Sequence, residues 1–118
     1  MGDTRQLRRE LASAKQTRTA ITRLELLESS ENILKARLYF AADLFVQVYC
    51  NDRFGTINYA LIQGDRRLYA RDRLDGQWHR HSVNEPALHD KSEEGQRPVA
   101  LNEFLDEVET LLIELDLL

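Results

Sequence analysis

The sequence predicts an α+β fold: an antiparallel meander sheet of five or six strands, a C-terminal helix packed on one face, and a peripheral N-terminal helix or arm. Three observations predict it. Strand-like runs, mostly of eight or nine residues, are joined by links of two to five residues, which suit hairpins but not the crossovers of parallel strands. The chain then ends in an amphipathic helical pattern. Finally, 118 residues is the length of one domain.

The N-terminal segment contains good helix formers but little apolar surface. Leu7, Leu11 and Ala14 recur at helical spacing and form a thin apolar stripe. Because such a stripe anchors a helix weakly, we expect residues 1–18 to form a helical arm outside the core. Residues 19–118 are then expected to form a single α+β domain.

Six runs in the middle of the chain have strand character. They are residues 19–27, 33–40, 44–51, 56–63, 66–74 and 77–82. In the second run we expect Leu34, Ala36, Leu38 and Phe40 to face inward, and Lys35, Arg37 and Tyr39 to face outward. Gly64 and Gly76 supply the positive φ that tight hairpins need.

The C-terminal third combines a loop and the strongest helix signal. Residues 84–100 are polar, hold both prolines and are expected to form a long loop. In the final segment, 101–118, the apolar face consists of Leu101, Phe104, Leu105, Val108, Leu111, Leu112 and Leu115. The polar face consists of Asn102, Glu103, Asp106, Glu107, Glu109 and Glu114. We expect this helix to lie across the inner face of the sheet.

Composition indicates a cytoplasmic globular protein without membrane association. No apolar run approaches the length of about eighteen residues needed for a membrane span, and the charged N-terminus lacks the apolar stretch of a signal peptide. The single cysteine, Cys50, cannot form an internal disulfide. It occupies an apolar strand position, so we interpret it as core filler rather than as a nucleophile. The sequence indicates no cofactor.

Charge is distributed unevenly along the chain. The net charge is −4, but residues 1–23 carry +4 and residues 85–118 carry −8. This balance excludes a protein that coats nucleic acid, while the two ends can meet each other or serve different partners. The absence of GxSxG, P-loop and GxGxxG motifs argues against a serine hydrolase, an NTPase and a dinucleotide enzyme.

The three histidines lie within eleven residues, in "GQWHRHSVNEPALHD". In an extended segment His79 and His81 share one face, with Trp78 and Arg80 on the other. Two imidazoles on one face can act as an acid and base pair or hold a metal with His89 or a nearby carboxylate. The alternative is a set of exposed histidines on a sheet rim with Trp78 packed beneath them.

The preceding strand adds arginines. Its alternation places Arg67, Tyr69, Arg71 and Arg73 on one face, within a hairpin turn of the histidines. Arginine, tyrosine and histidine on one face are typical of a phosphate- or RNA-binding surface. We therefore predict the following substrate-binding residues: Tyr69, Arg71, Arg73, Trp78 and His89. The alternative is a solvated face with ordinary ion pairs.

Four stretches together resemble a family. "LKARLYFAADLFVQVY", "NYALIQGDRRLYARD", "GQWHRHSVNEPALH" and "VALNEFLDEVETLL" resemble small prokaryotic proteins that are similar to TumE-type toxins of toxin–antitoxin pairs. The most specific part is the block from Asp72 through Trp78-His79-x-His81 to His89, although Ser82 stands where the family typically has proline. The resemblance implies a toxin with a helix-turn-helix antitoxin as partner.

Three functions follow as hypotheses. The first is an RNA-directed toxin, a ribonuclease in which His79 and His81 are catalytic proton carriers and RNA is the substrate. The second is a non-catalytic homodimeric or partner-binding module that uses the apolar tail "LLIELDLL". The third is a metal-dependent hydrolase, which requires His79, His81 and His89 within about 4 Å of one point. The first hypothesis is preferred, and it assigns no metal ligands.

Overall fold

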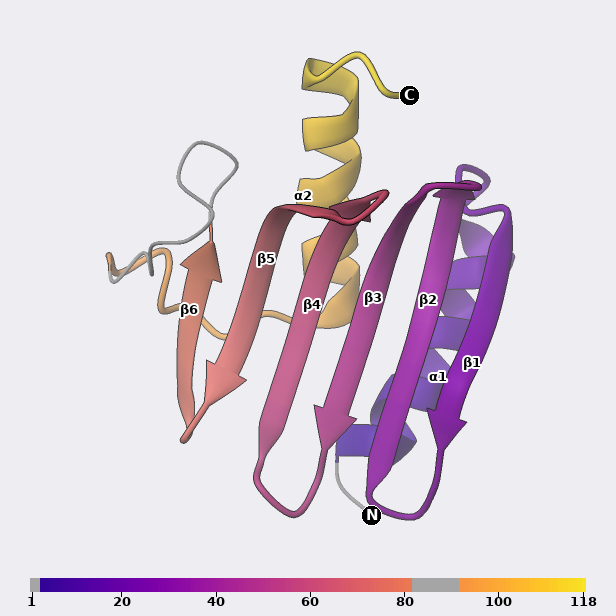
Figure 1. Ribbon diagram of the computed structural model, residues 1–118. Coiled ribbons are helices and arrows are strands. Elements are labelled where there is room, and N and C mark those ends of the chain that lie inside the picture. The colour runs from indigo at the N-terminus through magenta and orange to yellow at the C-terminus, as the bar shows by residue number, and fades with distance from the viewer. Residues whose placement is uncertain (1–2, 82–91) are drawn as a thin grey trace.

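The computed structural model confirms the α+β meander. It describes residues 3–81 and 92–118. Six strands form one antiparallel sheet in the order β1-β2-β3-β4-β5-β6, so every strand pairs with its neighbour in sequence (Figure 1). The strands are β1 (Arg23–Ser29), β2 (Ile33–Ala41), β3 (Leu44–Asn51), β4 (Thr56–Gln63), β5 (Arg66–Leu74) and β6 (Gln77–His81).

Two helices cover one face of this sheet. The helix α1 (Asp3–Thr17) contacts β1, β2 and β3, while α2 (Leu101–Glu114) contacts β4 and α1. Both lie behind the sheet in Figure 1. We call the helix-covered side the inner face and the side toward the viewer the outer face. Among the described residues, no helix covers the outer face, and no helix is long and apolar enough to cross a membrane.

The core lies between the inner face and the helices. Its sheet residues include Leu34, Ala36, Leu38, Phe40, Val46, Val48, Cys50, Ile57, Tyr59 and Leu61. The inward alternation predicted for β2 is therefore confirmed. Cys50 is fully buried, and burial together with the charge of Asp52 raises the pKa of its thiol to about 12. The thiol is neutral at physiological pH, as expected for core filler.

The predicted N-terminal helix is present, but it packs into the core and does not lie outside it as expected. Leu7, Leu11 and Ala14 are all buried in the same core as the sheet. The stripe is thin, but β1–β3 offer it a complementary apolar surface. The helix start is fixed by Asp52, whose carboxylate accepts hydrogen bonds from the Thr4 backbone N–H (3.2 Å) and hydroxyl (2.7 Å).

The basic N-terminal region and the acidic C-terminal region meet within one chain. Arg18, just after α1, donates hydrogen bonds to Asp106 (2.9 Å) and to the carboxylate of Glu109. It also donates to the backbone carbonyl of Asn102 (3.0 Å). The two ends of the sequence are therefore joined on the inner side of the sheet.

Replacing Leu11 by alanine tests whether α1 belongs to the core. Leu11 is 1% exposed, and removing a fully buried leucine should lower the free energy of unfolding by about 3 kcal/mol. Urea denaturation followed by circular dichroism measures this change. Gln16→Ala, at an exposed position of the same helix, should change stability by no more than about 0.5 kcal/mol. Equal small effects of both substitutions would contradict the assignment of α1 to the core.

The first strand differs from its predicted bounds. It begins at Arg23 rather than at residue 19, because the Ile21 N–H hydrogen-bonds to the Arg18 carbonyl and holds the chain in a turn after α1. A bulge between Leu26 and Glu28 then shifts the register. Leu26 pairs with the inner-face residue Ala36, yet its side chain is exposed on this edge strand. The hairpin glycines behave as expected, with φ of +64° at Gly64 and +77° at Gly76.

Candidate functional site

The hairpin of β5 and β6 divides the predicted site residues between the two faces of the sheet. Directly paired residues share a face, and Arg73 pairs with Trp78 while Asp72 pairs with His79. The inner face therefore receives Tyr69, Arg71, Arg73 and Trp78. The outer face receives Arg67, Asp72, His79 and His81.

The expectation that the arginines and histidines share one surface is therefore wrong. A bulge at Leu68 causes part of the difference: Leu61 pairs with Tyr69 but Ile62 pairs with Arg67. The extra residue in β5 turns Arg67 to the face opposite Tyr69. The expectation that His79 and His81 share a face, away from Trp78, is confirmed.

On the outer face, four side chains form a row that we call the Asp72 row: Arg67, His81, Asp72 and His79. Arg67 lies with one guanidinium nitrogen 3.5 Å from His81 Nδ1. His81 Nε2 lies 3.2 Å from Asp72 Oδ2. Asp72 Oδ1 lies 3.7 Å from His79 Nδ1, an ion-pair distance that is too long for a hydrogen bond. One carboxylate thus faces both imidazoles.

The two histidines have different environments within this row. His81 is 3% exposed, and its two ring nitrogens face Arg67 and Asp72. These contacts suit a role in holding Asp72 in place. The side chain of His79 is 15% exposed, and Nδ1 is its ring nitrogen at ion-pair distance from Asp72. A proton carried on Nδ1 beside this carboxylate leaves Nε2 as the proton acceptor. His79 is therefore the better candidate for moving a proton.

Sequence reasoning did not include Asp72 among the candidate site residues. The signal was nevertheless present in the hairpin. A two-residue turn at Asp75-Gly76, both with positive φ, places residue 72 opposite residue 79. Counting back from that turn would have found the carboxylate partner of the histidines.

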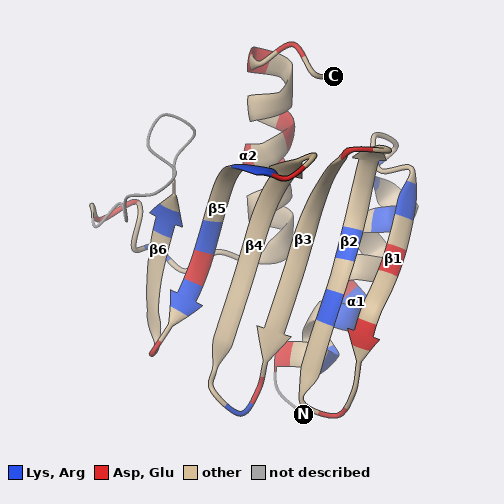
Figure 2. Ribbon diagram, viewed as in Figure 1, with Lys and Arg blue, Asp and Glu red and all other residues tan. Residues whose placement is uncertain are grey.

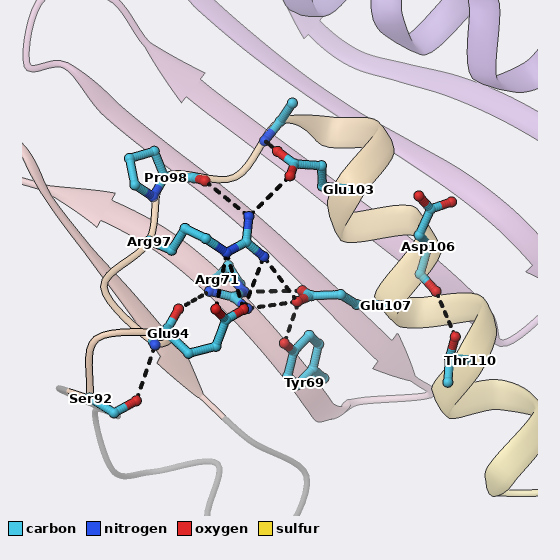
Figure 3. Close-up of polar contacts among 12 residues, drawn as sticks. Tyr69, Arg71, Ser92, Glu94, Arg97, Pro98, Glu103, Asp106, Glu107 and Thr110 are labelled. Carbon is cyan, nitrogen blue, oxygen red and sulfur yellow. Dashed lines mark hydrogen bonds and ion pairs between the residues drawn. The ribbon is translucent and has the colours of Figure 1, made fainter.

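On the inner face, Arg71 is fully buried and its donors are used inside the protein (Figure 3). It donates to both carboxylate oxygens of Glu107, at 3.0 and 2.6 Å. It also donates to the Glu94 carbonyl at 2.8 Å and to the Glu94 carboxylate at 3.2 Å. Tyr69 donates its hydroxyl to Glu107 at 2.9 Å. We therefore assign Tyr69 and Arg71 to the fold rather than to substrate binding.

The electrostatics of this cluster agree with a structural role. Burial by itself would lower the pKa of Arg71, but the hydrogen bonds and charge of Glu107 outweigh burial and raise it. Burial and the charge of Glu107 also raise the pKa of Tyr69. Arg97 extends the network by pairing with Glu94 (3.0 Å) and Glu103 (3.0 Å). The cluster ties β5, α2 and the segment before α2 together.

Arg73 and Trp78 also lie on the inner face. Arg73 donates to the Gly55 carbonyl at 2.8 Å and to Asp3 at 2.5 Å. Trp78 is buried, with its ring 6.0 Å from that of Tyr59. Neither side chain is on the same face as the histidines. The remaining predicted residue, His89, lies outside the described residues.

Within residues 3–81 and 92–118, one group of three potential metal ligands lies close together, and it does not include the histidines. It consists of Asp3, Cys50 and Asp52. Each of these groups already has a role in the fold, because Asp3 pairs with Arg73, Asp52 caps α1 through Thr4, and the Cys50 thiol is neutral. This group carries no metal assignment.

The outer face of β1–β3 presents arginines stacked on aromatic rings. The Arg23 guanidinium carbon lies 4.1 Å from the Tyr39 ring centroid, and that of Arg37 lies 4.5 Å from the Phe45 centroid. The Tyr39 hydroxyl also donates to Glu25 at 3.0 Å. Figure 2 shows basic positions on β1 and β2 beside acidic positions on β1. This surface therefore mixes basic, acidic and aromatic side chains and is not strongly basic.

Comparisons with protein-family models, with curated proteins and with solved structures gave no match to this chain. The functional assignment therefore starts from the geometry described above.

Proposed function

We propose that this protein cleaves RNA by general acid–base catalysis at the Asp72 row, with His79 as the proton carrier. The observation that supports this proposal is the Asp72 carboxylate, which faces His79 and His81 at 3.7 and 3.2 Å on the face of the sheet opposite the two described helices. A carboxylate that orients an imidazole is the arrangement by which histidine becomes an effective base.

The chemistry needs no nucleophile from the protein. His79 Nε2 accepts the proton of a ribose 2′-hydroxyl, and the 2′ oxygen forms a bond to the adjacent phosphorus. The bond from phosphorus to the 5′ oxygen breaks, and this oxygen takes the proton back from the imidazolium. The products are a 2′,3′-cyclic phosphate and a 5′-hydroxyl end. Asp72 stabilises the imidazolium between the two transfers, and His81 holds Asp72.

The remainder of the outer face suits an RNA strand. Unpaired bases stack on guanidinium planes. Arg23 and Arg37 lie over the buried rings of Tyr39 and Phe45, which hold the two guanidinium groups on the outer face. Arg67 adds a fixed positive charge at the other end of the Asp72 row. This arrangement revises the predicted site, because the arginines that support RNA binding lie on the outer face.

The biological role follows from the sequence resemblance. The block from Asp72 to His81 both resembles TumE-type toxins and contains three of the four members of the Asp72 row. We therefore propose a toxin component of a toxin–antitoxin pair, with a helix-turn-helix antitoxin as its partner. A non-catalytic homodimeric or partner-binding module is the second candidate, favoured by the exposed Ile113, Leu115 and Leu118 at the end of the chain.

Cleavage of labelled total RNA by wild type and by His79→Ala tests the catalytic proposal. Loss of the proton carrier should lower the rate by about 10²–10⁴-fold. Asp72→Asn should lower it less and should change its pH profile, because the imidazole loses its orienting charge. Asp65→Asn, which alters an exposed carboxylate in the β4–β5 turn, is the matched control and should leave the rate unchanged.

Each reaction is run with and without EDTA. The proposal expects cleavage by wild type in both conditions. Loss of cleavage with EDTA would favour a metal site, and equal cleavage by His79→Ala would remove His79 from the mechanism. If wild type does not cleave any RNA, the partner-binding module becomes the better assignment.

A further inference from the structure

A pocket of about 410 Å³ opens on the inner side of the sheet, away from the Asp72 row. It lies between the first half of α1, the inner face of β4–β6 and the segment that leads into α2. Its lining residues include Leu7, Ile57, Tyr59, Trp78 and Val99. This volume is within the range of small-molecule sites.

The interior of the pocket is mainly apolar and aromatic. The Tyr59 and Trp78 rings lie with their centroids 6.0 Å apart and their planes inclined at 35°. Both side chains are buried in the core and therefore hold fixed positions. The small part of each side chain that stays exposed lines the pocket together with Leu7, Ile57 and Val99, and such a rigid wall binds flat or apolar groups.

The polar residues of the pocket are mostly acidic. Asp3, Glu10 and Glu103 contribute three carboxylates, against the single guanidinium of Arg73. Arg73 is already bonded to Asp3 at 2.5 Å. Glu103 accepts a hydrogen bond from the Ala100 N–H at 2.9 Å and pairs with Arg97 at 3.0 Å. Two of the three carboxylates are therefore occupied by neighbouring groups.

Glu10 differs from the other two carboxylates. It is half-buried, and no residue within the described ranges forms an ion pair with it. Burial raises the pKa of Glu10, the charge of Asp3 raises it further, and a hydrogen bond from Gln6 opposes this change. A cation placed beside Glu10 would relieve this unfavourable environment.

We propose that this pocket binds a small organic cation that carries a primary ammonium on an apolar body. The ammonium lies beside Glu10, and the body packs against Tyr59 and Trp78. A carboxylate or phosphate ligand is disfavoured because it would lie beside the Glu10 carboxylate, which has no ion-pair partner within the described ranges. The site is on the opposite face of the sheet from His79, so it does not depend on the proposed RNA cleavage.

Trp78 is the only tryptophan, so its fluorescence reports on the pocket directly. The full-length protein is titrated with 2-phenylethylammonium, 2-phenylethanol and phenylacetate, which share a body and differ in charge. We expect a saturable change with the ammonium, binding at least about tenfold weaker for the alcohol, and no saturation with the carboxylate. Glu10→Gln should weaken ammonium binding by about tenfold. Glu114→Gln, at an exposed position of α2, is the matched control.

Two outcomes would overturn the proposal. One is the same response to all three compounds, which would indicate only apolar partitioning. The other is unchanged ammonium binding by a folded Glu10→Gln variant. If that variant does not fold, the comparison of the three compounds on wild type decides by itself. Amide chemical-shift changes confined to the lining residues would provide independent support.

Discussion

Arg71→Met should lower the free energy of unfolding by about 3 kcal/mol, measured by urea denaturation. The substitution removes a fully buried guanidinium and leaves the Glu107 carboxylate without its main partner. An uncompensated buried charge usually costs about 3–5 kcal/mol. We expect the lower end of this range because the Glu107 side chain is 25% exposed and keeps some contact with water.

Two further variants separate charge from packing. In the double variant Arg71→Met/Glu107→Leu, apolar side chains replace the whole ion pair, and about half or more of the lost stability should return. Arg66→Met, at an exposed position of the same strand, should change stability by no more than about 0.5 kcal/mol. If Arg71→Met lowered the free energy of unfolding by as little as Arg66→Met, the ion pair of Arg71 would not be needed for stability. Arg71 could then bind a ligand instead.

Phe104→Ala is the second substitution with a large expected effect, a loss of about 4 kcal/mol in the free energy of unfolding. Phe104 is fully buried in α2. Its ring stacks on Tyr69 at 5.7 Å and is tilted against Tyr59 at 5.4 Å. Truncation therefore leaves a cavity between α2 and the sheet and removes two aromatic contacts.

Ile113→Ala is the matched control for this experiment. Ile113 lies on the same helix but is 68% exposed, so its truncation should cost less than about 0.5 kcal/mol. Thermal unfolding by calorimetry would measure both variants. A similar small loss for Phe104→Ala would mean that α2 is only loosely attached to the sheet.

The strands of the sheet could be predicted because local signals agree there. β3, β4 and β5 begin and end at the residues expected from their alternation and from the turns between them. The start of β1 and the burial of α1 could not be predicted in the same way. Both depend on how elements that are distant in sequence pack together. The three-residue apolar stripe of α1 stabilises the helix little until β1–β3 provide a surface for it.

The candidate site could be predicted only where it depends on local alternation along a strand. A period of two places His79 and His81 together, and the structure agrees. The bulge at Leu68 cannot be detected from alternation, so Arg67 was expected on the wrong face. Glu107 was expected on the solvent side of its helix, because helical periodicity does not reveal that a buried Arg71 lies opposite it.

The meander order of the sheet also bears on how the chain folds during synthesis. Each strand pairs with the one made just before it, so the sheet can grow one hairpin at a time through contacts that are local in sequence. The helix α1 precedes the sheet in the sequence, yet it packs on β1–β3 and on α2, which follows the sheet. During synthesis α1 therefore completes its contacts only after all six strands and α2 have been made.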